Sequence, residues 1–266
     1  MSQTLAQTSN YDPVALHYDS TRNMPHQLLQ SLYQRAVAAG MLLPGTKVLD
    51  AGCGTAQLSL PLIEEGYQVL GIDVSQKMLD IAREKTKQHP NAVFKLLDVR
   101  QTGLPSGEYF TVVVSKLFQH VGSWEKAVQE LVRVTQHSGY VLHINEKDAF
   151  KNAVRKQFSA LCNERGYKRR YVGIDNRAEL AGSFESCGAI SVPFDASGLA
   201  WEKTISYGEA LTHLRLRLHS EFWIVPDNIY DDLLSQTEAW VDNHAAGKTT
   251  IEQMRPYLTV ESFRVS

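Results

Sequence analysis

Short apolar runs alternate with amphipathic helical segments along residues 46–144. This alternation is typical of β-α-β units, in which parallel strands form a sheet and the helices cover it. Each apolar run is short and rich in the β-branched or aromatic side chains that strands favour. The runs predict strands at residues 47–50, 68–73, 92–98, 110–115 and 140–145.

Helix signals separate these strands. Ser75 is the expected N-cap of a helix that continues until Pro90 stops it. From Trp124 onward, apolar residues recur at i, i+3, i+4, i+7 and i+8, which predicts a second helix. Farther along, the pattern predicts helices at residues 149–165 and 177–186 and strands at residues 189–194 and 257–265.

The last two predicted strands are separated by about 60 residues, far more than an ordinary loop of about 4–6 residues. Residues 199–256 in this interval contain leucines at helical spacing and three of the four tryptophans. We therefore expect a helical cap that is inserted before the last strand. Its aromatic side chains suit the wall of a pocket for a partly apolar molecule, and they equally suit a satellite core or a dimer face.

Composition narrows the class of protein. The 266 residues are 43% hydrophobic and 21% charged, as in an ordinary globular protein, and the formal net charge is −2. No apolar run approaches the roughly 18 residues of a membrane helix, and the N-terminus resembles no signal peptide. Three cysteines without CxxC spacing argue against a disulfide framework and a zinc site. We expect a cytoplasmic protein that binds small molecules, with no metal and neither nucleic acid nor membrane as partner.

The most informative segment is residues 48–56, an apolar strand that ends in an acid and enters a tight glycine turn before a helix. Gly52 and Gly54 let a ligand approach the backbone, and the helix N-terminus favours a carboxylate or phosphate. This predicts a cofactor site. A dinucleotide fingerprint would have a third glycine or alanine where Gln57 stands, which weakens the case for a nicotinamide cofactor.

Three successive predicted strands end in an acid. These residues are Asp50, Asp73 and Asp98, and Asp73 follows Gly54 by 19 residues. Because ligands of open α/β sheets bind at the carboxyl ends of the strands, the three carboxylates are expected at one binding edge. A carboxylate in the place of Asp73 can accept hydrogen bonds from both hydroxyls of a ribose.

These motifs resemble the class I S-adenosylmethionine-dependent methyltransferases, in particular their small-molecule branch. The resemblance covers roughly residues 11–145. Residues 11–25 resemble the family's N-terminal helix, residues 48–55 resemble its first motif, and residues 71–75 with Met78 resemble its second motif. Asp98-Val99 with Leu104-Pro105 resembles the motif on the adenine side, and residues 124–134 resemble the helix before the fifth strand. The sequence departs from the family at Ala56, where a third glycine is common, at Thr111, where Asp is usual, and at His137-Ser138-Gly139, where Pro-Gly-Gly is usual.

The resemblance implies an α/β fold with a Rossmann-like, mostly parallel sheet of about seven strands, helices on both faces and the cap before the last strand. Residues 1–198 and 257–266 would form the cofactor-binding core, and residues 199–256 the cap. The cofactor would be S-adenosylmethionine, and the reaction a methyl transfer to an oxygen, nitrogen or carbon of a small, partly apolar metabolite.

The resemblance also implies a role for each site residue. At the methionine part of the cofactor, Gly52 and Gly54 would contact it, Tyr18 and Arg22 would meet its carboxylate, and Asp50 would organise the loop or reach the amino group through water. Asp73 would hold the ribose, Asp98 would accept from the adenine amino group, and Ser115 would border the methyl group. The remaining residues of the expected cofactor site are Cys53, Val74, Met78 and Val99.

The acceptor side is less defined. His120 lies five residues past Ser115, where the family often carries a histidine, and it is the candidate general base; the other interpretation is that it orders the loop. Trp223 and Tyr18 are candidate acceptor contacts. A monomer or homodimer is expected, and a nicotinamide-dependent oxidoreductase and a noncatalytic S-adenosylmethionine-binding protein stay open as alternatives.

Overall fold

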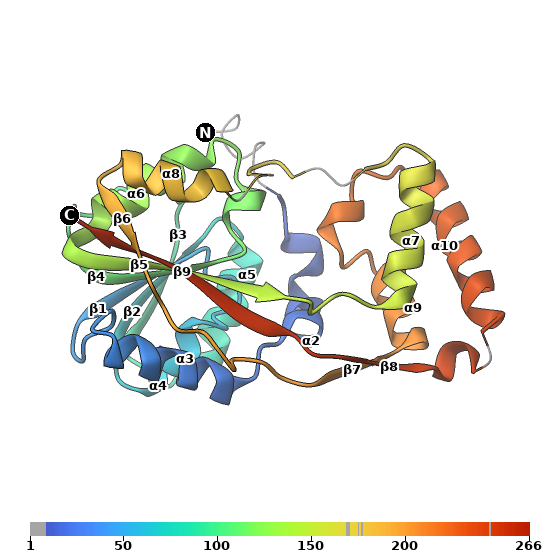
Figure 1. Cartoon of the computed structure of the whole chain (residues 1–266), viewed down its shortest axis with the longest axis horizontal. Helices are drawn as coiled ribbons and strands as arrows, with labels where there is room; N and C mark the ends of the chain where they lie inside the picture. Colours follow the sequence, from blue (N-terminus) through green and yellow to red (C-terminus); the bar gives the residue numbers. More distant parts are fainter. Residues whose placement is uncertain (1–8, 169–170, 175, 177, 245) are drawn as a thin grey trace.

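The computed structural model describes residues 9–168, 171–174, 176, 178–244 and 246–266. Seven strands form one sheet, in the order β3-β2-β1-β4-β5-β9-β6 (Figure 1). The strands are β1 (Lys47–Ala51), β2 (Gln68–Asp73), β3 (Ala92–Leu96), β4 (Tyr109–Ser115), β5 (Thr135–Lys147), β6 (Ala189–Val192) and β9 (Tyr257–Val265). Neighbouring strands pair in parallel except at β9, which is antiparallel to β5 and β6.

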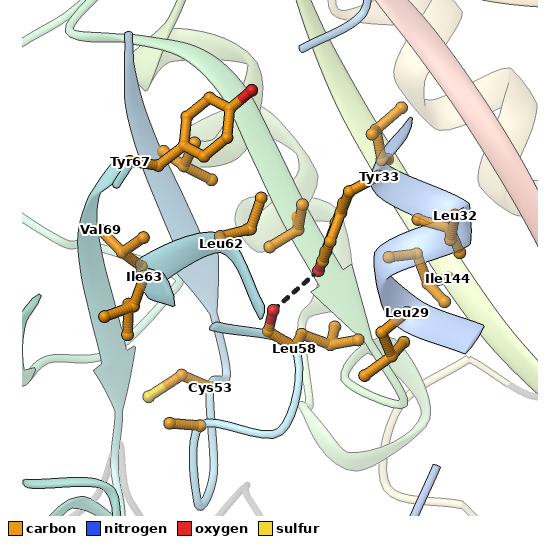
Figure 2. Close-up of a cluster of buried hydrophobic side chains, with 14 of the residues drawn as sticks. Leu29, Leu32, Tyr33, Cys53, Leu58, Leu62, Ile63, Tyr67, Val69 and Ile144 are labelled. Atoms are coloured by element: carbon orange, nitrogen blue, oxygen red, sulfur yellow. Dashed lines mark hydrogen bonds between the residues drawn. The ribbon is translucent and has the colours of Figure 1, made fainter. Parts of the chain in front are cut away.

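Helices cover both faces of this sheet, as the sequence predicts. One face carries α3 (His26–Ala38), α4 (Ser59–Glu64) and α5 (Gln76–Lys85); the other carries α6 (Trp124–Val134) and α8 (Ala178–Ser186). Figure 2 shows the first of these layers, where the buried Tyr33 hydroxyl donates a hydrogen bond to the Leu58 carbonyl oxygen at 2.9 Å. Burying these apolar faces supplies the main stabilisation of the core.

A smaller helical unit lies beside the sheet (Figure 1). It contains α7 (Ala153–Glu164), α9 (Tyr207–Arg215) and α10 (Asp227–Asp242), whose buried side chains form one apolar cluster. Helix α7 falls within the segment that the sequence assigned to the core, yet its residues Val154, Phe158 and Cys162 pack in the cluster of the cap. The cap therefore draws on residues from both sides of β6.

The cap is joined to the core by a two-stranded antiparallel ribbon that the sequence did not reveal. It pairs β7 (Lys203–Ser206) with β8 (Ile251–Met254). Short 3₁₀ turns complete the fold: η1 (Asp12–His17), η2 (Phe118–His120), η3 (Ser220–Phe222) and η4 (Gly247–Thr249). Among the described residues, no helix is both long and apolar enough to cross a membrane.

Several predicted boundaries shift. Strand β3 ends at Leu96, so Asp98 lies in the turn that follows and not at a strand end as predicted. The reason is local: Asp98 accepts hydrogen bonds in this turn from the backbone N–H groups of Arg100 and Gln101. Strand β5 is longer than predicted at both ends, where it pairs with β4 and with β9.

Candidate active site

A cavity of about 450 Å³ lies at the carboxyl ends of β1, β2, β4 and β5, between the sheet and the cap. Helix α2 (Tyr18–Arg22) and the 3₁₀ turn η1 lie at this seam (Figure 1). Nine of the site residues that the sequence suggested line the cavity: Tyr18, Arg22, Gly52, Gly54, Asp73, Val74, Met78, Ser115 and His120.

The glycine turn has the backbone that its sequence predicts. Gly52 and Gly54 have φ angles of 73° and 53°, in the left-handed region that glycine tolerates best. Ala56, which replaces the family's third glycine, also has a positive φ of 66°, and its methyl group is buried in the core. The turn therefore keeps its shape without the third glycine, and it carries one strained alanine.

Asp73 holds this turn to the end of β2. Its Oδ2 accepts a hydrogen bond from the Gly54 backbone N–H at 2.9 Å, and its Oδ1 accepts from the Ser75 N–H at 2.8 Å. The Ser75 side chain in turn caps α5, where it accepts from the Met78 N–H, so the predicted N-cap is confirmed. Asp73 is thereby oriented toward the cavity by two backbone donors.

A second, smaller cavity continues from the first. It shares Gly52, Asp73 and Val74 with the large cavity and is also lined by Asp98 and Val99. Two of these residues have the roles that the resemblance implies for this end of the cofactor: Asp73 is expected at the ribose and Asp98 at the adenine. The two cavities together give an elongated site along the sheet edge.

Asp98 has a partner that the sequence did not reveal. Its carboxylate accepts hydrogen bonds from Arg100, with the shortest, to Nη2, at 2.6 Å. Burial raises the pKa of Asp98, but the hydrogen bonds and charge of Arg100 outweigh burial and lower the pKa below its ordinary value. The carboxylate is therefore ionised at neutral pH and can accept a further hydrogen bond from a ligand.

Three other residues that the sequence suggested for the site line neither cavity. Asp50 is buried behind the turn, where its Oδ2 accepts a hydrogen bond from Ser59 Oγ at 2.6 Å. The Cys53 side chain packs in the apolar core. Trp223 contacts the wall from behind, with its indole edge-on to Tyr11 at a centroid distance of 5.2 Å.

The N-terminal segment is attached to the glycine turn by side-chain contacts. The Asp12 carboxylate accepts a hydrogen bond from Ser75 Oγ. Asp19 accepts from Thr55 Oγ1 at 2.5 Å and forms an ion pair with Lys85. These contacts hold η1 and α2 against the glycine turn and α5 at the edge of the cavity.

His120 belongs to a small polar network that the sequence analysis missed. Its Nε2 lies 2.9 Å from the Tyr11 hydroxyl oxygen, and its Nδ1 lies 3.3 Å from Ser9 Oγ. The Tyr11 hydroxyl also bonds to Ser220 Oγ of the cap at 3.1 Å. Burial raises the pKa of Tyr11, so its hydroxyl keeps its proton at neutral pH. His120 is thus held at the cavity wall between the N-terminal segment and the cap.

Comparison with known proteins agrees with this site. Residues 48–139 match the family described as "Methyltransferase domain". The chain is 33% identical over 135 residues to demethylmenaquinone methyltransferase of Streptomyces griseus subsp. griseus, covering 50% of this chain and 57% of that enzyme. It is 34% identical over 140 residues to phosphatidylethanolamine N-methyltransferase of Cereibacter sphaeroides, covering 50% of this chain and 68% of that enzyme.

The fold, the site and these matches together define the family: the chain belongs to the class I S-adenosylmethionine-dependent methyltransferases, and its cofactor is S-adenosylmethionine. The Haemonchus contortus phosphoethanolamine N-methyltransferase 2, solved with S-adenosylmethionine, has a similar fold with a TM-score of 0.54. That likeness has 16% identity and covers 96% of this chain and 57% of that one, and it concerns the fold alone.

The described residues fit this cofactor. Ser115 Oγ is buried and has no hydrogen-bond partner among them, so it is open to a ligand's polar group. Arg22 is only 7% exposed, and within the described part of the chain no carboxylate pairs with it. A buried arginine without a counter-ion is costly, and a ligand carboxylate would offset that cost. Asp73 supplies the acceptor that a ribose needs.

Other cavity residues gave no signal in the sequence. They are Tyr11, Lys116, Glu146, Phe150, Arg155 and Glu221. Tyr11 and Lys116 lie inside the segment that carries the family resemblance, and Lys116 directly follows Ser115. Glu146 lies near the end of β5, and the others come from the loop after β5 and from the cap, where no spacing rule connects them.

Proposed function

We propose that this protein transfers a methyl group to an oxygen, nitrogen or carbon of a small, partly apolar metabolite. The observation that carries the proposal is the single elongated site. Asp73 and the glycine turn line one end of it, while His120 and the aromatic side chains of Tyr11 and Phe150 line the other. A site of this form can hold a cofactor and an acceptor at the same time.

In the proposed reaction, the protein mainly positions its ligands. When bound, S-adenosylmethionine supplies a methyl group that its positively charged sulfur makes electrophilic. Gly52, Gly54 and Asp73 hold the cofactor, and Ser115 borders its reactive end. The N-terminal segment and the cap exclude water and bring the acceptor atom into line, which is the main contribution that such a transfer needs.

A hydroxyl or acidic carbon acceptor also needs a base, and His120 takes that role in the proposal. The Tyr11 hydroxyl donates its proton to Ser220 Oγ and accepts from His120 Nε2–H, so Nδ1 is the ring nitrogen that can accept a proton from the acceptor. The Tyr11 hydroxyl, 2.9 Å away, keeps the imidazole oriented.

The substitution His120→Ala tests this role. We expect turnover to fall by about 10²-fold or more while the affinity for S-adenosylmethionine stays nearly unchanged, because the base acts only at the transfer step. His26→Ala is the matched control, since His26 is partly exposed and its Nε2 lies 2.7 Å from the Glu64 carboxylate, away from the residues that line the cavity. Equal turnover of the His120→Ala variant at saturating acceptor would assign His120 a structural role.

Two measurements test the function as a whole. Calorimetric titration with S-adenosylmethionine, S-adenosylhomocysteine and NAD is expected to show binding of the first two only. Incubation with radiolabelled S-adenosylmethionine and a metabolite extract is then expected to label a small molecule. NAD binding would support the oxidoreductase alternative, and cofactor binding without labelling would support a noncatalytic binding protein.

The proposal also covers the location of the protein, its oligomeric state and the part of the chain that selects the acceptor. We place the protein in the cytoplasm, acting on a free small molecule as a monomer or homodimer, with residues 199–256 of the cap selecting the acceptor. Sedimentation analysis of the purified protein measures the oligomeric state, and a tetramer or larger assembly would contradict this part.

A further inference from the structure

Four positively charged side chains surround one phenyl ring at the seam between core and cap. The charged groups of Arg22, Lys116, Arg155 and Lys203 lie 5.3–5.7 Å from the centre of the Phe150 ring. They come from α2, the turn after β4, α7 and β7. Arg22, Lys116, Arg155 and Phe150 line the large cavity, and Lys203 stands beside them.

Only two of these four cations have a carboxylate partner among the described residues. Lys116 forms an ion pair with Glu146, and Arg155 forms one with Glu221. The cluster therefore carries two positive charges that its own carboxylates do not balance.

The remaining two cations contact neutral oxygens. Arg22 donates hydrogen bonds to Thr21 Oγ1 and to the Leu218 carbonyl oxygen, and Lys203 donates to the Thr21 carbonyl oxygen. The other carboxylates that line the large cavity, Asp12 and Asp73, are held by Ser75 and Gly54 at the cofactor end.

Bringing positive charges together out of water is unfavourable. The unbalanced positive charge around Phe150 therefore favours an anionic ligand at this place. The methionine carboxylate of the cofactor can balance Arg22. The same cofactor, however, also brings a sulfonium and an ammonium group, and Lys203 has no carboxylate partner among the described residues, so the cluster around Phe150 stays positively charged when the cofactor is bound.

A second observation lies on the same wall. Glu146 Oε1 is buried and has no hydrogen-bond partner in the described structure, while its other oxygen, Oε2, pairs with Lys116. A buried carboxylate oxygen that lacks a donor costs free energy. It is therefore available to accept from an N–H or O–H group of a ligand that lies beside Lys116.

We propose that the part of the cavity around Phe150, lined by Lys116 and Arg155 with the unbalanced Lys203 beside them, binds an anionic group, a carboxylate or a phosphate, of the methyl acceptor. This rests on the proposed function and specifies its substrate class: a small molecule with an anionic end and an adjacent N–H or O–H group. The cations lower the nucleophilicity of the anion they bind. The anionic group is therefore the part by which the acceptor is recognised, and the methyl group goes to another atom.

The test uses the full chain saturated with S-adenosylhomocysteine, which occupies the cofactor site. Inorganic phosphate and succinate are titrated separately by calorimetry. We expect at least one of them to bind, and the tighter of the two identifies the phosphate or the carboxylate as the preferred group. The double variant Arg155→Gln/Glu221→Gln removes a cation without leaving a buried carboxylate unpaired.

The double variant is expected to bind the preferred anion at least tenfold more weakly, with the affinity for S-adenosylhomocysteine unchanged. Lys203→Gln, which removes one unbalanced charge, should weaken binding in the same direction. Arg165→Gln, at the C-cap of α7, is the matched control, since Arg165 pairs with Asp232 at the surface and the substitution should leave binding unaltered.

Three results would overturn the inference: neither anion binds the saturated protein, the anions displace S-adenosylhomocysteine, or the double variant binds them as the wild type does. Displacement would mean that the anions occupy only the position of the methionine carboxylate. Failure of S-adenosylhomocysteine itself to bind would instead overturn the proposed function.

Discussion

Asp73 has a structural role in the glycine turn, and we propose that the same side chain binds the ribose. It anchors the glycine turn through the Gly54 N–H, and its carboxylate lines both cavities where the ribose is expected. We predict that Asp73→Ala weakens S-adenosylmethionine binding by at least about 1–3 kcal/mol, because the ribose hydroxyls lose their acceptor.

Titration calorimetry measures this effect, and a melting curve of the variant shows whether it is folded. Asp195→Ala is the control, since the Asp195 carboxylate lies in an exposed loop, where it accepts a hydrogen bond from the Ser197 N–H. A folded Asp73→Ala variant with wild-type affinity for the cofactor would rule out the ribose contact.

Asp50 gives the folded state a pH dependence. Burial raises the pKa of Asp50 to about 7, against the opposing effect of the hydrogen bond from Ser59. Because the folded pKa lies above that of an unfolded aspartate, the folded state binds the extra proton. The stabilising contribution is complete below about pH 4 and is lost as the pH rises through about 7.

We predict that Asp50→Asn removes the decrease in folding stability that the ionisation of Asp50 causes as the pH rises. Relative to the wild type, the free energy of unfolding of the variant should rise between pH 4 and pH 8, by at most about 4 kcal/mol. Urea unfolding of the apoprotein across this range measures the difference. Asp80→Asn, at a surface carboxylate, serves as the control; parallel profiles for Asp50→Asn and wild type would show that Asp50 is ionised throughout.

At the scale of elements, the segment of η1, its N-cap Tyr11 and α2 places Tyr11, Tyr18 and Arg22 at the cavity, and a few polar contacts hold this segment in place. Asp19 is the main one, through Thr55 Oγ1 and Lys85. The contact is partly exposed, so its direct effect on the free energy of unfolding is small, below about 1 kcal/mol.

We predict that Asp19→Ala speeds the release of S-adenosylhomocysteine several-fold while the melting temperature changes little, because the segment must then be ordered by the ligand itself. Stopped-flow dissociation measures this rate. Glu84→Ala breaks a comparable ion pair with Lys87 on the exposed face of α5 and should not change it. Equal release rates would show that the segment stays closed without Asp19.

Elements whose local signals agree with their packing were predicted closely. Strand β2, strand β9 and helix α6 have the predicted bounds, because periodicity and burial point the same way. The ribbon of β7 and β8 escaped prediction, since each strand has four residues and their pairing spans some 45 residues of chain. Helix α7 was predicted, but its packing partner was not, because periodicity shows that a face is buried and not what buries it.

At the scale of the whole molecule, the two halves of the site differ in how far the sequence revealed them. Parallel strands bring their carboxyl ends to one edge, so the glycine turn and Asp73 could be placed from topology alone. The acceptor half joins Tyr11, Phe150, Arg155 and Glu221, which only the docking of the cap on the core brings together. No local sequence pattern predicts how the cap packs on the core, so the charged cluster around Phe150 could not be predicted from the sequence.

This docking gives the cap a specific route to the acceptor. Trp223 is held by its Nε1, which donates to the Arg217 carbonyl oxygen at 2.7 Å, and its ring packs edge-on against Tyr11. Tyr11 in turn lines the cavity and contacts His120. We therefore propose Trp223 as a positioning residue: it contacts the cavity wall and would act on the acceptor through Tyr11.

We predict that Trp223→Ala raises the KM for the acceptor several-fold and leaves the affinity for S-adenosylmethionine unchanged, because the cofactor half of the site does not depend on this contact. Steady-state kinetics with each ligand varied in turn separates the two effects. Trp240→Ala is the matched control, since Trp240 packs on Tyr207 and His244 within the cap, and it should lower the melting temperature with little change in KM. If Trp223→Ala alters only the melting temperature or the oligomeric state, the cap is a structural unit and the acceptor is selected by the core and the N-terminal segment.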